Sequence, residues 1–194
     1  MAKGKGKGSS FERDVAKQLS AWLTRGENPD CLWRSAMSGG KATVTGSAVG
    51  TGDLVAVHPD GHPLIERVCF ELKRGYPAAD WYSIVESNKP AKPIVDFIKQ
   101  AKDSASLGAC PMWSIIHKRD RKRPMVYFDG GFHEDLEGLL LNSVGYHNRA
   151  VMILELFNQS TGIHVCGTTL EAFLQINPDS FLDRVDHNTI IGDF

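Results

Sequence analysis

Two acidic residues and a lysine stand in a pattern that could bind a divalent cation. Glu71 and Lys73 are two positions apart in a segment with the alternation of a β-strand, residues 64–73, so their side chains project from one face. Asp53 opens the preceding apolar segment, residues 53–57, and a hairpin between the two segments would place Asp53 beside Glu71. Adjacent carboxylates repel each other unless a cation lies between them, and Mg²⁺ prefers such hard oxygen ligands.

A cation held at this position could promote hydrolysis of a phosphodiester. It could polarise the phosphate, lower the pKa of a bound water and stabilise the leaving oxygen. The ammonium group of Lys73 could orient the attacking water or balance charge in the transition state. The alternative is that Glu71 and Lys73 form an ordinary ion pair on an exposed strand face. The Gly52-Asp53 pair at the start of the neighbouring strand favours the metal site.

The elements that must position these residues follow from the spacing of apolar side chains. Apolar residues recur at helical spacing between Phe11 and Trp22, which predicts a helix that begins at Ser9 and ends near Gly26. Ser9 and Glu12 also have the spacing of a capping box. Residues 1–8 alternate lysine and glycine and predict a disordered basic tail, which could touch phosphates or merely aid solubility.

The rest of the chain alternates between strand-like and helix-like segments and predicts an α/β fold, a mixed central sheet flanked by helices. The expected elements are a short strand over 31–37, a mobile loop over 38–52, a hairpin of 53–57 with 64–73, an irregular segment over 75–93, a helix over 94–107, a second hairpin of 111–117 with 124–128, a helix over 133–144, strands over 151–157 and 163–166, and a helix over 168–175.

Composition is that of an ordinary globular protein, with 42% hydrophobic and 23% charged residues in 194. No apolar run is long enough to span a membrane, and the four scattered cysteines favour a reduced, cytoplasmic setting, in bacteria or phage-infected cells. Residues 1–125 carry 20 basic and 13 acidic side chains, whereas residues 126–194 carry 2 and 10. The basic part suggests a polyanionic partner, although pairing between the two parts would explain the same asymmetry.

A cluster of cations lies in the turn of the second hairpin. The sequence HKRDRKRP contains Lys118, Arg119, Arg121, Lys122 and Arg123. Like charges so close together are destabilising without a partner, and backbone phosphates of DNA would relieve them. An exposed loop screened by salt is the alternative. Trp81 and Tyr82 could stack on bases or wedge a junction, or belong to the core.

Four motifs in order resemble the PD-(D/E)XK nuclease superfamily, and more narrowly the Holliday-junction-resolvase group with related phage and bacterial nucleases. The motifs are GSSFERD, WRSAMSGG, GDLVAV and CFELKRGY. The resemblance covers residues 9–128 and implies a restriction-endonuclease-like core, with residues 129–194 as an acidic C-terminal α/β extension packed on it. The family's proline before the aspartate is Gly52 here.

The resemblance implies that Asp53 and Glu71 bind metal together with the backbone carbonyl of Leu72, and that Lys73 is the catalytic lysine. Glu12 would be the family's additional acidic residue, although a cap with Ser9 would occupy the same carboxylate in part. Ser38 stands where those resolvases keep a functional serine, and a simple flexible turn is the alternative reading.

Further residues would contact DNA. Arg34, Arg74 and the turn from Lys118 to Arg123 could bind phosphate, and Gln100 stands where several branches of the superfamily place a glutamine facing the site. No tyrosine follows Gln100 four residues later, so a solvated position is the alternative.

The expected function is a Mg²⁺-dependent DNA endonuclease, which Mn²⁺ would also support, leaving 5′-phosphates. Branched DNA is the first expected substrate, and two cuts in a symmetric junction imply a homodimer. Linear duplex DNA, as in a phage or restriction-type endonuclease, is the alternative substrate. A non-catalytic DNA-binding module, or an interaction protein whose acidic tail mimics DNA, are the alternatives from other functional classes.

Overall fold

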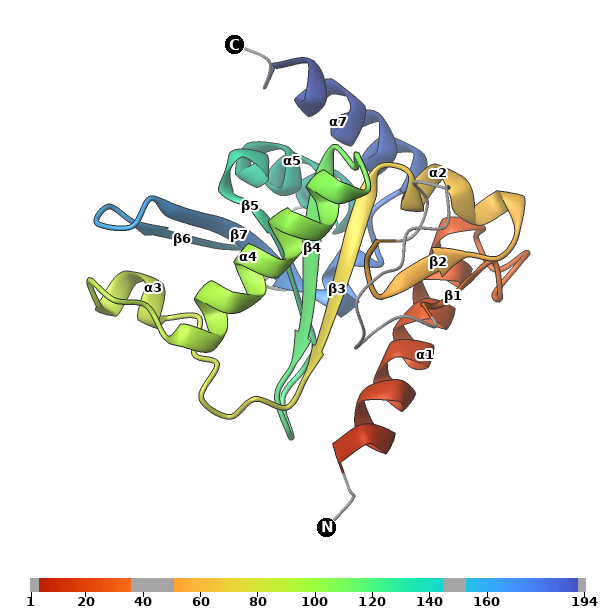
Figure 1. Ribbon diagram of the computed structural model, residues 1–194. Helices are drawn as coiled ribbons and strands as arrows, with labels where there is room; N and C mark the ends of the chain where they lie inside the picture. Colours follow the sequence, from red (N-terminus) through yellow and green to blue (C-terminus); the bar gives the residue numbers. More distant parts are fainter. Residues whose placement is uncertain (1–3, 36–50, 145–152, 192–194) are drawn as a thin grey trace.

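A computed structural model describes residues 4–35, 51–144 and 153–191, and its centre is a five-stranded mixed sheet (Figure 1). The strands are β3 (Val68–Arg74), β4 (Met112–Lys118), β5 (Met125–Asp129), β7 (Ile163–Thr169) and β6 (Leu154–Asn158), in that spatial order. β4 is parallel to β3, and the remaining pairs are antiparallel. A two-stranded antiparallel sheet of β1 (Leu32–Arg34) and β2 (Leu54–Ala56) lies beside β3.

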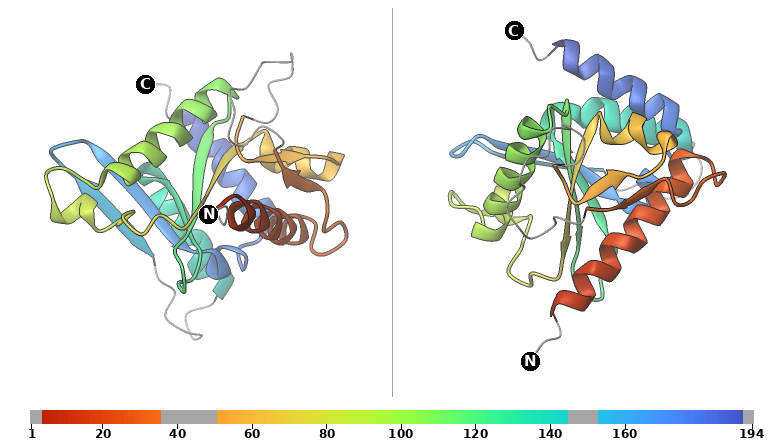
Figure 2. Two further views of the ribbon diagram at one scale, coloured as in Figure 1. Left: turned by 60° about the horizontal axis from the view of Figure 1, so that its bottom comes forward. Right: turned by 45° about the vertical axis from the view of Figure 1, so that its right-hand side comes forward.

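Helices cover both faces of the sheet, which confirms the predicted α/β class and is consistent with a restriction-endonuclease-like fold. One face carries α4 (Lys92–Leu107) and α3 (Ser83–Glu86). The other carries α1 (Gly4–Leu23), α5 (His133–Val144), α6 (Leu170–Phe173) and α7 (Pro178–Ile191) (Figure 2). The short η1 (Pro59–Gly61) and α2 (His62–Ile65) join β2 to β3, and η2 (Gly130–Phe132) precedes α5.

Strand β3 shows how the sequence divides its side chains between the two faces. Phe70 and Leu72 belong to the core under α1, whereas Cys69 packs with the core under α4. Glu71 and Lys73 share the α4 face with Cys69, because successive side chains of a strand alternate. Both polar residues are nevertheless buried, with 2% and 7% of their surface exposed.

The C-terminal residues complete the main sheet and its core. β7 pairs with β5 from Met125↔Thr169 to Asp129↔Val165, so the sheet runs continuously past residue 128. Rings from α6 and α7, Phe173 and Phe181, contact Trp22 of α1 at centroid distances of 4.9 and 5.8 Å. The Trp22 indole Nε1 also donates to the carbonyl of Ile176 at 2.7 Å.

Helix α1 begins at Gly4, earlier than the predicted start at Ser9. Residues 4–8 are therefore helical where the sequence predicted disorder, and Ser9 and Glu12 lie inside the helix, so the predicted capping box is wrong. Once a packed segment has nucleated a helix, each added residue gains a hydrogen bond at little further cost. The apolar face from Phe11 onward therefore supports a preceding turn that glycine-rich composition alone disfavours.

The predicted hairpin of 53–57 with 64–73 is also wrong. β2 pairs with β1, and β3 pairs with β4, because η1 and α2 redirect the chain between β2 and β3. One backbone bond survives between the two segments, from Asp53 N to Phe70 O at 2.8 Å.

Other expectations are confirmed with shifted ends. β4 and β5 form the predicted second hairpin, and α4 and α5 correspond to the predicted helices. The strand predicted from 151 begins at Leu154, and the helix predicted from 168 is the single turn α6, capped by Thr169. Helix α7 was not expected, although Asn177 before Pro178 is a helix-start signal, and the Asn177 side chain accepts from Ser180 N at 3.1 Å.

Candidate active site

Asp53 and Glu71 lie near each other at the outer edge of β3, as the sequence predicted. The predicted hairpin is not what brings them together. The chain before β2 runs past this edge, where Asp53 N donates to Phe70 O. The Asp53 carboxylate in turn accepts from Leu72 N through Oδ2 at 2.7 Å. Asp53 is therefore fixed at both backbone and side chain, and 9% of its surface is exposed.

Gly52 allows this close approach. A Cβ atom at position 52 would lie 2.5 Å from Phe70 O and 3.0 Å from Cys69 Sγ. Any side chain would push the segment away from β3, and Asp53 with it. The glycine before the aspartate is thus a requirement of the local packing rather than a neutral departure from the resolvase pattern.

Glu71 and Lys73 are joined in a network that α4 completes. Lys73 Nζ donates to Glu71 Oε2 and to Gln100 Oε1, both at 2.8 Å. Gln100 Nε2 donates to Glu71 Oε2 at 2.6 Å, and Ser104 Oγ donates to Glu71 Oε1 at 2.9 Å. Both carboxylate oxygens of Glu71 are therefore held, and the pair is not the exposed Glu–Lys pair that was the alternative.

Ser104 is a site residue that sequence reasoning missed. It lies one helical turn after Gln100, so the two side chains share the face of α4 that covers β3. Thr51 Oγ1 donates to the carbonyl of Ser104 at 2.7 Å, which ties α4 to the segment that carries Asp53. The signal in the sequence is the position of Ser104 four residues after Gln100, where the superfamily pattern has a tyrosine.

Burial and repulsion together disfavour ionisation of Asp53. The pKa of Asp53 is raised to about 6, chiefly by burial and then by the nearby charge of Glu71, although the Leu72 N–H and Lys73 act to lower it. Two carboxylates held this close are the arrangement that a cation stabilises.

The chain as a whole matches one protein family. The family described as "Phage putative PDDEXK endonuclease" matches residues 3–183. The chain belongs to this family. Comparisons with curated proteins and with solved structures found no match to the chain. PD-(D/E)XK nucleases usually use divalent metal ions, so the donor atoms can be compared with what such an ion needs.

The donors at the β3 edge fit a hard divalent cation. Asp53 and Glu71 supply carboxylates, and the N–H of Leu72 points at Asp53. In a strand the N–H and C=O of one residue point to the same side, so the Leu72 carbonyl also faces Asp53. Among the described residues no cluster of three or more His, Cys, Asp or Glu forms a metal site. An ion here would rest on two carboxylates, a carbonyl and water, which suits Mg²⁺.

Glu12 and Arg34 lie at the same edge as a pair. Arg34 Nη1 is 3.4 Å from Glu12 Oε2, and the charge of Glu12 contributes to the raised pKa of Asp53. Glu12 is thus near Asp53, and Arg34 contacts an acidic side chain. Ser38, together with most of the loop predicted over 38–52, lies outside the described residues.

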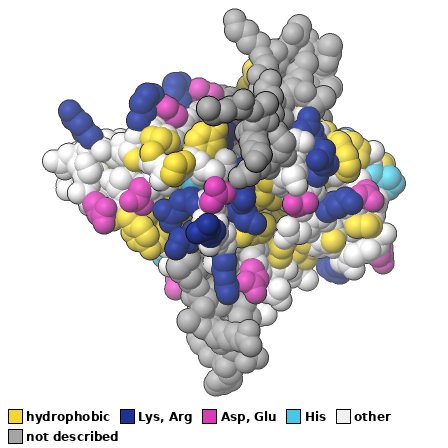
Figure 3. All heavy atoms as spheres, turned by 90° about the horizontal axis from the view of Figure 1, so that it is seen from below, with side chains coloured by type: hydrophobic (Ala, Val, Ile, Leu, Met, Phe, Trp, Pro, Cys, Tyr) yellow, Lys and Arg dark blue, Asp and Glu magenta, His cyan; other side chains and the backbone are white. Residues whose placement is uncertain are grey.

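The basic turn between β4 and β5 lies at the same end of the sheet as Lys73. Arg74 Nη2 forms an ion pair with Asp120 in this turn at 3.2 Å, and Gly75 N donates to Lys118 O at 2.9 Å. Seen from below, lysine and arginine side chains gather near the centre of the molecule (Figure 3). The turn is therefore anchored beside the strand that carries the catalytic lysine expected for a PDDEXK nuclease.

Trp81 is part of the core and does not form an exposed wedge. Its ring stacks on Tyr127 at a centroid distance of 3.6 Å, and its Nε1 donates to His117 Nδ1 at 3.0 Å. Tyr82 is 50% exposed. No helix in the described parts of the chain is long and apolar enough to cross a membrane.

Proposed function

We propose that the protein is a divalent-metal-dependent DNA endonuclease whose site is formed by Asp53, Glu71 and Lys73. The observation that carries the proposal is the convergence of two buried carboxylates from separate segments at the free edge of β3, with a lysine bonded to one of them. Membership of a PDDEXK endonuclease family supports the same chemistry.

Each residue has a distinct role in this proposal. Asp53, Glu71 and the Leu72 carbonyl hold Mg²⁺, or Mn²⁺ in its place, and Glu12 holds a further water or metal contact. When bound, the ion supplies a water of lowered pKa and polarises the phosphate. Lys73 Nζ, held by Glu71 and Gln100, would orient the attacking water and balance developing negative charge.

Gln100 and Ser104 act as positioning residues. Both donate to Glu71, and Gln100 also accepts from Lys73. They lock the rotamers of the two side chains that do the chemistry, so we propose that Gln100 acts through Glu71 and Lys73 rather than on DNA directly.

DNA is held by the basic surface near this edge. The proposed phosphate contacts are Arg34, Arg74, Lys118, Arg119, Arg121, Lys122 and Arg123. Branched DNA is the proposed substrate, on the strength of the resolvase-like motifs, and cleavage of both strands of a junction then requires a two-fold homodimer. The products carry 5′-phosphates.

The test compares three DNA structures with and without Mg²⁺. A four-way junction, a linear duplex with the same arm sequences and a single strand are each incubated with the purified protein. We expect Mg²⁺-dependent cuts in the junction at a rate at least tenfold above that in the duplex. Equal cutting of junction and duplex would support the linear-duplex alternative and remove the branched-DNA proposal.

Variants of the site separate catalysis from DNA binding. Asp53→Ala, Glu71→Ala and Lys73→Ala should each abolish cleavage while binding to the junction is retained, and Asp96→Asn, an exposed α4 acid, should cut as the wild type does. Because the three residues act as a unit, a double variant should be no worse than the singles. Full cleavage by Asp53→Ala would refute the proposed site.

A further inference from the structure

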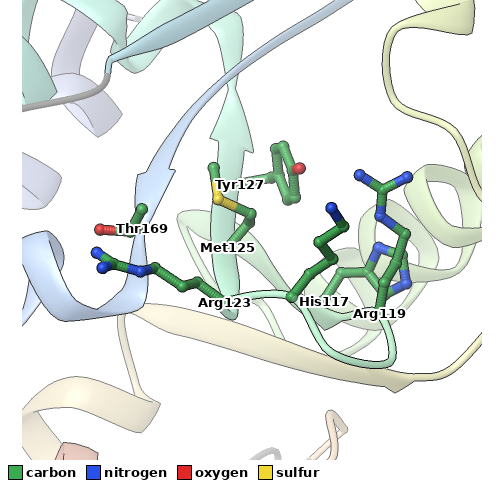
Figure 4. A pocket seen from close by; sticks show the side chains of 7 residues that line it. His117, Arg119, Arg123, Met125, Tyr127 and Thr169 are labelled. Atoms are coloured by element: carbon green, nitrogen blue, oxygen red, sulfur yellow. The ribbon is translucent and has the colours of Figure 1, made fainter.

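A hollow of about 210 Å³ opens beside the β4–β5 turn (Figure 4). It is lined by three cations of the turn, the half-buried Arg119 and the exposed Lys122 and Arg123, and by the half-buried Met125 and the buried Tyr127 of β5. The remaining lining residues are His117 and Thr169. The hollow is therefore basic at its mouth and mostly apolar at its base.

The register of the sheet places this hollow in line with the catalytic lysine. Lys73 pairs with His117, His117 with Met125, and Met125 with Thr169, so the four form one row across four strands. Paired residues of neighbouring strands point to the same face. At about 4.8 Å per strand, Met125 lies about 10 Å from the position of Lys73, on the same face of the sheet.

The cations around the hollow lack an anion inside it. Arg119 is half-buried, and its side chain forms no ion pair or hydrogen bond within the described residues, whereas its backbone carbonyl accepts from Lys122 N at 3.2 Å. Burial lowers the pKa of His117 and raises the pKa of Tyr127, and the charge of Arg119 acts to lower the pKa of each, so Arg119 lies close to both. Arg123 is paired with Glu171 at 3.0 Å, but both side chains are more than 70% exposed and easily exchange partners.

His117 does not supply the missing negative charge or an open acceptor. Its Nδ1 accepts from Trp81 Nε1, so Nε2 carries the proton and donates to Gly75 O at 3.1 Å. A half-buried guanidinium with no acidic partner is costly unless an external anion pairs with it. The hollow can thus accept an anionic group, which none of its described lining residues provides.

We propose that this hollow binds one backbone phosphate of the DNA strand that is cut, about two to three nucleotides from the scissile phosphate along the row from Lys73. This inference rests on the proposed function and makes it more specific. Arg119 is the principal contact, and Lys122 and Arg123 add charge at the rim. Because the hollow lies on one side of Lys73 only, the enzyme requires the phosphate on one side of the cut and not its counterpart on the other.

The test removes phosphate charges one at a time. Substrates carry a single neutral methylphosphonate at successive positions on the cut strand, on both sides of the cleavage site. With the wild type we expect one position beyond the scissile phosphate where neutralisation slows cleavage at least about tenfold. In Arg119→Gln cleavage of the unmodified DNA should be slowed by a similar factor, and neutralising that same position should cost nothing more.

A matched variant and a binding measurement decide the outcome. Arg25→Gln removes the same charge at the far end of α1, where Arg25 pairs with Asp179, and should leave the methylphosphonate profile unchanged. Methylphosphonate profiles that are identical in the wild type and Arg119→Gln would overturn the proposed phosphate subsite.

The same substrates are also titrated in metal-free binding assays. If the wild type binds but cuts no DNA, coupling between Arg119 and one phosphate in binding would keep the subsite while the nuclease proposal falls. Absence of that coupling would remove the subsite itself.

Discussion

At the scale of single residues, the site contains the carboxylate of Asp53, whose ionised form destabilises the metal-free protein. Asp53 is buried beside Glu71, and its pKa is raised to about 6. The native protein therefore binds a proton at Asp53 more tightly than the unfolded chain does. It follows that the metal-free protein loses stability as the pH rises from about 4 to about 6, and that this cost persists at neutral pH.

Replacing Asp53 by asparagine should stabilise the metal-free protein. An amide keeps the acceptor for Leu72 N and carries no charge, so Asp53→Asn should raise the free energy of unfolding at pH 8 by about 2 to 3 kcal/mol, with little change at pH 4. Urea unfolding at the two pH values in the presence of a chelator measures this. Asp96→Asn on the exposed face of α4 is the control and should leave the pH profile unchanged. If Asp53→Asn were less stable than the wild type at pH 8, the ionised Asp53 carboxylate would not destabilise the native protein.

The placement of Glu71 and Lys73 could be predicted because it depends on local strand geometry. The residues that hydrogen-bond to them from α4 could not be predicted in this way. The two-residue spacing of Glu71 and Lys73 places both on one face of any strand. Ser104 is 33 positions from Glu71 in the chain, and nothing in the local pattern says which helix will cover β3. Only the position of Ser104 one turn from Gln100 linked it to the site.

At the scale of elements, the close crossing of the Asp53 segment over β3 positions the carboxylates. The sequence analysis correctly predicted that Asp53 lies beside Glu71, but for the wrong reason, because the prediction assumed a hairpin between their two segments. A strand, a helix and a second strand in succession, as in β3, α4 and β4, are typical of a parallel pair. The hairpin of β4 with β5 was predictable because its turn is short and both partners are adjacent in the chain.

The crossing can be tested with glycine variants. Gly52→Ala would place a methyl group 2.5 Å from Phe70 O, so we expect a loss of about 1 to 3 kcal/mol in the free energy of unfolding, together with weaker metal binding. Gly138→Ala in α5 is the matched control. Nothing lies within 4 Å of its added Cβ, so we expect a gain of about 0.5 to 1 kcal/mol. Equal stability and metal affinity of Gly52→Ala and wild type would contradict the packing argument.

At the scale of the whole molecule, pairing inside the fold accounts for part of the charge asymmetry of the sequence. Basic residues of the first part pair with acidic residues of the last: Arg67 binds Asp186 through two bonds of 2.8 and 2.9 Å, and Arg25 binds Asp179. These pairs lie away from the β4–β5 turn, where Arg123 pairs with Glu171 on the surface and, among the described residues, the side chain of Arg119 forms no ion pair. The sequence could show the imbalance but not where it is neutralised, because that depends on the fold.

The joint binding of one divalent ion by Asp53 and Glu71 is the central claim, and a calorimetric titration with Mn²⁺ tests it most directly. Mn²⁺ is titrated into the metal-free wild type, Asp53→Asn, Glu71→Gln and the control Asp96→Asn at pH 7.5. We expect a site in the wild type and the control whose affinity falls at least about tenfold in each of the other two variants, because each removes a carboxylate ligand. Wild-type Mn²⁺ affinity in Glu71→Gln would contradict the account.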